Sequence, residues 1–489
     1  MSFKNKLKEA YSNKVTAPKD YKELQEKVEI KETRYYLFKA LKLTGVCALA
    51  SVGVFVLGIG ATVLISGMHI NENVADSVKK VRFSMYDTNL IESETFKYLN
   101  SVTYDAAKND LEIDPEFITY VNNFAEKTYS GFNKTGNFAY SPLMVYTQMD
   151  LISLALSTPE TINEMNAALG TEDTALRGRN VYRAMMNNSY ADKKQKSTVQ
   201  AKNAVFFDHK RALSNINPTF LEGLTNRRAE VYGMSFDSAY DVNNILKWVD
   251  QSVNENNYIT KEDLDIQDDT FIAFISSLYF DNAWQKKYVT KDTKDDTFYL
   301  SDGSTVTTKF MNHVTFTELK DFDNYVSVTD YYKYGYYVEY FVPKKIEDNI
   351  FNLLPADFLT KEPVEKHNQP VSLSMPKFEA VCKNEITDIV KGAGIETMYK
   401  EIPNNCLENA VESPEFLYSY IQRTKQKTTV SFDEDGTIVK TVTFSYGAAG
   451  TSTAPGGSQV DLNQPFVYCI KDRSGLPLVL GAVNNPTEK

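Results

Sequence analysis

The chain has 489 residues, of which 42% are hydrophobic and 24% charged, an ordinary globular mixture. A net charge of −11 excludes a basic nucleic-acid-binding surface as a bulk property. Four cysteines are too few for a disulfide-stapled fold of this length, and four widely spaced histidines disfavour a histidine-based metal site or catalytic triad. We therefore expect a large globular protein with no metal, no cofactor and no nucleic-acid partner.

The first 42 residues form a basic head, with 11 lysines and arginines against 6 aspartates and glutamates. The next 26 residues, Leu43 to Met68, contain no charge. About 20 apolar residues cross the ~30 Å hydrocarbon layer of a bilayer. Buried helices of soluble domains rarely reach this length without a charge. Residues 43–68 are therefore predicted to be a transmembrane helix, an uncleaved signal anchor whose partner is the lipid bilayer.

The basic residues around this span predict its orientation. Five lie close before Leu43, whereas the first three after the span are Lys79, Lys80 and Arg82. Because basic residues stay on the cytoplasmic side, the head, 1–42, is expected in the cytoplasm and the rest outside the cell. Residues 69–113 have no sustained hydrophobic period and are predicted to be a stalk or linker. The sequence thus predicts a single-pass membrane protein with an extracellular body.

The body, residues 114–489, is predicted to be one α+β domain. Its opening carries helix signals: Pro142 and Pro159 follow a serine and a threonine at helix starts, and Gly170 marks a helix end. From about residue 200, aromatic and β-branched stretches predict strands, among them AVFFD, FIAFISSLYF, TVTTKFM, YYVEYFVP and VSLSMPKF. Helices followed by sheets within one continuous chain indicate this fold class.

The body also resembles the serpin family, on seven segments that follow one another in the family's order. They are NFAYSPL, FISSLYFDNAWQKKYV, DTFYLSDGSTVTTKFMNH, VSLSMPKF, GIETMY, VSFDEDGT and QPFVYCIKDRSGLPLVLGAVNNP. The resemblance implies helices packed around a large mixed main sheet, smaller sheets and an exposed reactive loop. It implies a protease inhibitor and not an enzyme. The target protease, the expected covalent partner of a monomeric body, cuts the loop and is held as an acyl-enzyme while the cut loop enters the main sheet as a new strand, an established form of strand addition.

The expected loop begins at Glu434-Asp435-Gly436-Thr437, ends before Asp461, and has its strand excluded from the sheet in the intact protein. Alternate side chains of a strand face opposite sides. With Thr437 inward, the buried set is uncharged and consists of Thr437, Val439, Thr441, Thr443 and Ser445. This register permits insertion. Inhibitory serpins carry small residues at this hinge, however, and the bulkier Val439 keeps open a non-inhibitory serpin with a binding or scaffold role.

The scissile bond is predicted at Gly450-Thr451, fourteen residues on from Gly436 by the family's spacing, with Ala449, Ser452 and Thr453 as neighbours. A count back from Pro465 gives Ala454-Pro455 instead, which is disfavoured because proline after the bond resists most serine proteases. The surrounding GAAGTSTAPGG has no arginine, lysine or aromatic residue. It favours an elastase-like or subtilisin-like target, with papain-like cysteine proteases as the alternative.

Four residues are predicted to control the opening of the main sheet: Ser141, Ser276, Gln426 and Trp284. The family places two serines, an asparagine and a histidine beneath the opening. Ser141 matches the first serine, Met144 replaces the second, and Ser276 and Gln426 stand where asparagine and histidine are expected. The sequence therefore predicts an altered hydrogen-bond network at this point.

Overall fold

The computed structural model describes residues 97–100, 111–192, 196–212, 215–267, 269–346, 348–401, 405–412, 418–439 and 458–488. These residues belong to the second of the two units into which the chain divides, Ser84–Lys489. The predicted head and membrane span, most of the predicted stalk, and residues 440–457 of the predicted loop lie outside them. Among the described residues, no helix has the length and apolarity to cross a bilayer.

Helices begin and end where local sequence signals predict them. Helix α8 (Pro142–Ser153) starts at its proline, and the Ser141 side chain accepts a hydrogen bond from Met144 N. Helix α9 (Pro159–Leu169) ends at Gly170, where φ is 87° and an added Cβ would lie 2.7 Å from the Tyr120 ring. The other helices are α7 (Pro115–Ser130), α10 (Thr174–Asn187), α11 (Pro218–Asn226), α12 (Ala239–Ser252), α13 (Lys261–Leu264), α14 (Ile350–Leu353) and α15 (Thr387–Gly392).

The main sheet is mixed and has eight strands in the described part of the chain. Seven follow the order β1-β5-β4-β6-β14-β13-β12, and β3 pairs with β4. Strands β4 and β5 run parallel, and the other neighbours run antiparallel. The bounds are β1 (Lys97–Tyr98), β3 (Ser189–Asp192), β4 (Ser197–Asp208), β5 (Ala229–Met234), β6 (Ile272–Ala283), β12 (Phe378–Glu385), β13 (Lys425–Phe432) and β14 (Gly436–Val439).

A second sheet has nine strands, in the order β15-β11-β8-β9-β10-β16-β17-β2, with β7 paired to β8. Its first strand, β15, pairs in parallel with β11. Because β14 belongs to the main sheet, the predicted loop connects the two sheets. The bounds are β2 (Phe138–Tyr140), β7 (Lys294–Tyr299), β8 (Thr305–Asp321), β9 (Tyr325–Tyr331), β10 (Tyr337–Pro343), β11 (Glu365–Pro376), β15 (Ser458–Asp461), β16 (Phe466–Lys471) and β17 (Pro477–Val483). The five stretches predicted as strands lie in strands, apart from Phe271 and Tyr336 at the start of two of them and Lys377 between β11 and β12.

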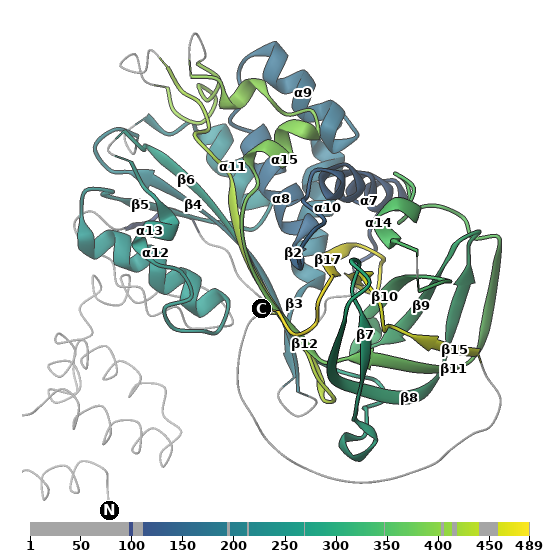
Figure 1. The fold of residues 1–489 in the computed structure, drawn as a ribbon. Coiled ribbons are helices and arrows are strands. Elements are labelled where there is room, and N and C mark those ends of the chain that lie inside the picture. Colours follow the sequence, from purple (N-terminus) through teal and green to yellow (C-terminus); the bar gives the residue numbers. More distant parts are fainter. Residues whose placement is uncertain are drawn as a thin grey trace, which may run out of the picture. The chain divides into compact units, whose positions relative to one another are not determined.

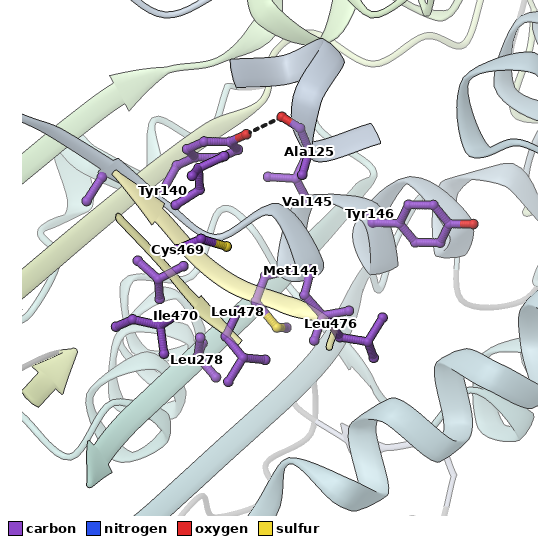
Figure 2. Close-up of a cluster of buried hydrophobic side chains, with 14 of the residues drawn as sticks. Ala125, Tyr140, Met144, Val145, Tyr146, Leu278, Cys469, Ile470, Leu476 and Leu478 are labelled. Atoms are coloured by element: carbon purple, nitrogen blue, oxygen red, sulfur yellow. Dashed lines mark hydrogen bonds between the residues drawn. The ribbon is translucent and has the colours of Figure 1, made fainter. Parts of the chain in front are cut away.

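Helices cover both faces of β6: α8 contacts it from one side and α12 from the other (Figure 1). On the α8 side, Met144, Leu278 and Cys469 lie in the main hydrophobic core (Figure 2). On the α12 side, Trp248 packs edge-on against Phe206. A strand added beside β6 is therefore enclosed by protein on both faces.

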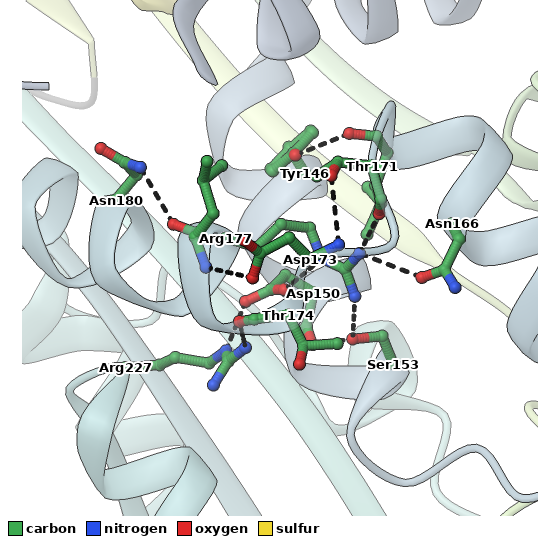
Figure 3. A network of polar contacts seen from close by, with 12 residues as sticks. Tyr146, Asp150, Ser153, Asn166, Thr171, Asp173, Thr174, Arg177, Asn180 and Arg227 are labelled. Atoms are coloured by element: carbon green, nitrogen blue, oxygen red, sulfur yellow. Dashed lines mark hydrogen bonds and ion pairs between the residues drawn. The ribbon is translucent and has the colours of Figure 1, made fainter. Parts of the chain in front are cut away.

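A buried ion network holds α8 in place (Figure 3). The Asp150 carboxylate of α8 accepts from Arg177 Nε at 3.0 Å and from Arg227 Nε at 2.5 Å. Arg177 also donates to Asn166 Oδ1 at 3.0 Å. Removing one partner from such a network leaves a buried charge unpaired, which typically costs 3–5 kcal/mol, on the order of a third of a domain's stability. The position of α8 relative to α10 is therefore strongly fixed.

The folded domain reaches into the range predicted as a stalk. Lys97–Tyr98 pair with β5 at the edge of the main sheet. The Asn100 side chain donates to Thr225 Oγ1 and to Ala229 O, both at 2.9 Å, and accepts from Val231 N. Residues 97–100 thus cover an otherwise open sheet edge. A strand of two residues is too short to show a hydrophobic period in the sequence. It forms because it pairs with residues more than a hundred positions away.

Candidate functional site

The first residues of the predicted loop already form a strand in the main sheet. Strand β14 lies between β6 and β13 and pairs with both. Val439 is opposite Phe280 on one side and opposite Val430 on the other. The expectation that the intact protein excludes the whole loop strand is therefore wrong for Gly436–Val439. Hydrogen bonds to two neighbours, and the burial of Val439, compensate for the ordering of these four residues.

Side chains inside the sheet hold β14 in register. Thr437 is fully buried, and its Oγ1 lies 2.6 Å from Tyr332 Oη. The Tyr332 ring stacks on Trp284, with 4.3 Å between the centroids. Val439 is 4% exposed, whereas Ile438 between them is half-buried. The predicted inward residues Thr441, Thr443 and Ser445 lie outside the described residues.

Gly436 stands where no side chain fits. A Cβ at this position would lie 2.2 Å from Asn282 O and 2.8 Å from Ala283 Cα, both atoms of the β6 backbone. Because backbone atoms cannot rotate away, any larger residue would push β14 from its neighbour. Glycine at this hinge is thus required by the close approach of two strands.

Glu434 anchors the turn that precedes β14. Its carboxylate accepts from Lys377 Nζ at 2.6 Å and from Thr293 Oγ1 at 2.9 Å. Burial by itself raises the pKa of Glu434, but the hydrogen bonds, that from Lys377 above all, outweigh it and hold the pKa below its usual value. Asp433 Oδ1 closes the turn by accepting from the backbone N–H of Asp435 and Gly436. The turn that precedes the loop hinge is therefore held in one conformation by hydrogen bonds.

The predicted sheet-opening residues divide into two places. Gln426 Oε1 accepts from Ser141 N at 2.7 Å, and Ser141 Oγ donates to Leu478 O at 2.6 Å. Ser276 Oγ makes no hydrogen bond within the described part of the chain. Trp284 follows the last residue of β6 and is eight residues beyond Ser276, roughly 26 Å along the strand at about 3.3 Å per residue. Its Nε1 donates to Asp433 O. Trp284 thus supports the hinge and not the Ser141–Gln426 pair.

A cavity of about 890 Å³ continues from the end of β14. Val439 lines it, and the strands β6 and β13 contribute residues 272–278 and 425–429 to its walls. In the described residues these two strands pair with β14 and not with each other. The main sheet thus has a space in line with β14. This space lies between β6 and β13, the two strands that pair with β14.

Sequence reasoning missed Lys377 and Tyr332. Lys377 lies within the segment VSLSMPKF, but nothing in its local pattern indicates an ion pair with a residue 57 positions later. Tyr332 stands among several tyrosines of similar pattern. Only the pairing of distant strands brings these side chains to the hinge.

A helix-covered mixed sheet that accepts part of a long loop as a central strand defines a class of strand-inserting proteins. The sequence pattern described as Serpin (serine protease inhibitor) matches residues 119–486, and this chain belongs to the serpin family. It is similar to Serpin-Z2A of Triticum aestivum, with 27% identity over 72% of this chain and 90% of that protein. The native-state crystal structure of the thermophilic serpin tengpin covers 78% of this chain and 97% of its own at 20% identity, with a TM-score of 0.64. The thyroxine-binding globulin complex with thyroxine covers 76% of this chain and 100% of its own at 18% identity, with a TM-score of 0.62.

Proposed function

We propose that this serpin inhibits a protease by adding its cut reactive loop to the main sheet between β6 and β13. The observation that carries the proposal is the position of β14 between β6 and β13. It lies in line with the cavity, with Thr437 and Val439 buried on the core side. A longer loop strand in the same register extends an arrangement that the sheet already accommodates.

In the proposed reaction the protease's serine oxygen attacks the carbonyl carbon of Gly450. The bond to the Thr451 nitrogen breaks, and that nitrogen leaves as an amine after taking a proton. An ester then joins the protease to Gly450 until water hydrolyses it. Insertion of residues 440–446 before this hydrolysis moves the attached protease away from its original site, so the rate of insertion decides between trapping and simple cleavage.

We infer an elastase-like or subtilisin-like serine protease as the target, because the residues around Gly450 are small and uncharged. Papain-like cysteine proteases are the second choice. We also propose that residues 43–68 anchor the protein in a membrane, with the serpin body outside the cell. The support is the uncharged run of 26 residues and the five basic residues before it.

Val439 favours one competing function, a non-inhibitory serpin with a binding or scaffold role. Its branched side chain occupies the position at which inhibitory members carry a small residue. Thyroxine-binding globulin, a structural neighbour, binds thyroxine. Both functions fit the same fold, and they differ in whether a covalent complex forms.

One experiment separates these functions. The full chain, in detergent, is mixed with pancreatic elastase or subtilisin and analysed by SDS gel electrophoresis and thermal unfolding. Inhibition predicts a covalent band stable to SDS and a large rise in melting temperature after cleavage within 440–457. A rise without a covalent band would favour the non-inhibitory role. If cutting produced neither a covalent band nor a rise, insertion by the wild-type chain would be refuted. For topology, protease added to intact cells should digest the body and spare residues 1–42; protection of the body would refute the proposed orientation.

A further inference from the structure

The two strands that flank the cavity direct half of their backbone groups into it. Directly after β6, Trp284 N donates to Asp435 O at 3.1 Å, which is toward β14, whereas directly before β6, Phe271 O accepts from Asp208 N of β4. The register between β4 and β6 is unbroken from Ile272 to Asn282. Because the direction of the backbone groups alternates along a strand, the even-numbered residues of β6, Phe274 among them, face the cavity.

On β13, the odd-numbered residues direct their backbone groups toward β14 and the cavity. Thr424 O accepts from Ile386 N on the β12 side, at 2.9 Å, whereas Asp433 N donates to Gly436 O on the β14 side, at 3.0 Å. The register between β12 and β13 is constant over all eight residues of each strand. The odd-numbered residues of β13, Lys427 among them, therefore direct their backbone groups into the cavity.

On each of the two strands that flank the cavity, one backbone carbonyl accepts a hydrogen bond from a side chain outside the main sheet. Gln148 of α8 donates from Nε2 to Phe274 O at 2.8 Å. Tyr258, in the segment between α12 and α13, donates from its hydroxyl to Lys427 O at 2.9 Å. Both residues line the cavity. Each side chain thus occupies the acceptor that the backbone N–H of an added strand would use.

Both caps belong to firmly held parts of the fold. Gln148 lies on α8, whose Asp150 carboxylate is bonded to two buried arginines. Tyr258 is 5% exposed, and the Lys427 ammonium lies 2.5 Å from its carbonyl oxygen and 4.5 Å from its ring centroid. Displacing the Tyr258 ring therefore breaks more than one contact, whereas displacing the Gln148 side chain breaks its hydrogen bond to Phe274 O.

We propose that Gln148 and Tyr258 act as edge caps that compete with an added strand for its hydrogen-bonding sites and so limit how far and how fast it advances. The inference rests on the proposed function. Continuing the β14 register places residue 442 opposite Lys427 and residue 445 opposite Phe274. Insertion therefore proceeds without competition through residue 441 and then displaces Tyr258 first and Gln148 second. The caps also shield the two edges from strands of other chains.

The variants Gln148→Met and Tyr258→Phe test the proposal because they remove the donor and keep the bulk. Two matched controls remove equivalent bonds away from the cavity. Gln464→Met loses a bond from Nε2 to Pro343 O of 3.1 Å, and Tyr146→Phe loses a bond from its hydroxyl to Leu169 O of 2.9 Å. If the caps only satisfied buried carbonyls, caps and controls would lower the stability of the intact chain alike and change nothing else.

The readout is the rate at which the full chain, cut within 440–457 by subtilisin, gains resistance to heat. One lost hydrogen bond of average strength corresponds to about a five-fold change in rate. We expect each cap variant to insert about five-fold faster than wild type, and the double variant about 25-fold faster. The controls should insert at the wild-type rate.

The outcomes separate this inference from the proposed function. A cut wild type that gains heat resistance, with cap variants no faster than the controls, overturns the inference alone. A cut wild type that gains nothing, while the double variant does, supports caps that block insertion. No gain in either protein refutes both the caps and the proposed function.

Discussion

Replacing Thr437 by arginine tests whether β14 is the start of the inserted strand. Thr437 is fully buried on the core side of the main sheet and is bonded to Tyr332. An unpaired guanidinium at this position costs several kcal/mol, on the order of the stability that β14 contributes. Ile438 supplies the matched control because it is the next residue of the same strand, is only half-buried and faces the opposite side.

The expected loss follows from the contacts of β14. Releasing the strand gives up the Thr437 hydrogen bond, about 1 kcal/mol, and the burial of Val439, about 2 kcal/mol. Thr437→Arg should therefore lower the free energy of unfolding of the intact chain by about 3 kcal/mol. Ile438→Arg should lower it by less than about 1 kcal/mol, as surface substitutions do.

The assay combines urea unfolding of the intact chains with thermal unfolding after the loop is cut. Wild type and Ile438→Arg should gain melting temperature on cutting and form an SDS-stable complex with elastase. Thr437→Arg should be cut at the same bond, form no complex and gain no melting temperature. The reasoning is refuted if the two arginine variants behave alike, because β14 then has no buried face that matters for insertion.

Three further predictions concern individual side chains. Gly436→Ala should destabilise the intact chain by about 2 kcal/mol in urea unfolding because its Cβ would meet the β6 backbone, whereas Gly136→Ala, with no atom nearby, should have no effect; equal effects would contradict the close approach. Burial raises the pKa of Glu339, but Lys471 and Lys320 outweigh it and lower the pKa to about 2, so its carboxylate stabilises the fold above pH 4.5 and this contribution, about 3 kcal/mol, is lost as pH falls toward 2. Urea unfolding at pH 6 and pH 2.5 should show a smaller difference for Glu339→Gln than for wild type, and an unchanged difference would count against the buried pair. Burial raises the pKa of Cys469 to about 12, so iodoacetamide at pH 8 should label it only in unfolded protein, as peptide mass spectrometry would detect; rapid labelling of the native chain would contradict its burial.

The residues of the loop hinge show which features the sequence predicted and which it did not. The alternation from Thr437 onward predicted that Thr437 and Val439 share one face of the strand and Ile438 the other, because successive side chains point to opposite sides. The burial of Thr437 and Val439 agrees with that alternation, whereas Thr441, Thr443 and Ser445 lie outside the described residues. The same reasoning did not predict that Gly436–Val439 already lie between β6 and β13. That depends on the close approach at Gly436 and on Tyr332, about 105 residues away in the chain.

The sequence by itself determined the local structure: helix α8 starts at Pro142, α9 ends at Gly170, and the aromatic and β-branched stretches became strands. These features follow from a few adjacent residues, through proline's missing N–H, glycine's access to positive φ and the two-residue period of strands. Only the tertiary structure decided the pairing of Lys377 with Glu434, 57 residues apart, and the two caps on the cavity edges. Their hydrogen bonds exist only when distant strands and helices pack, and no short-range pattern records such long-range contacts.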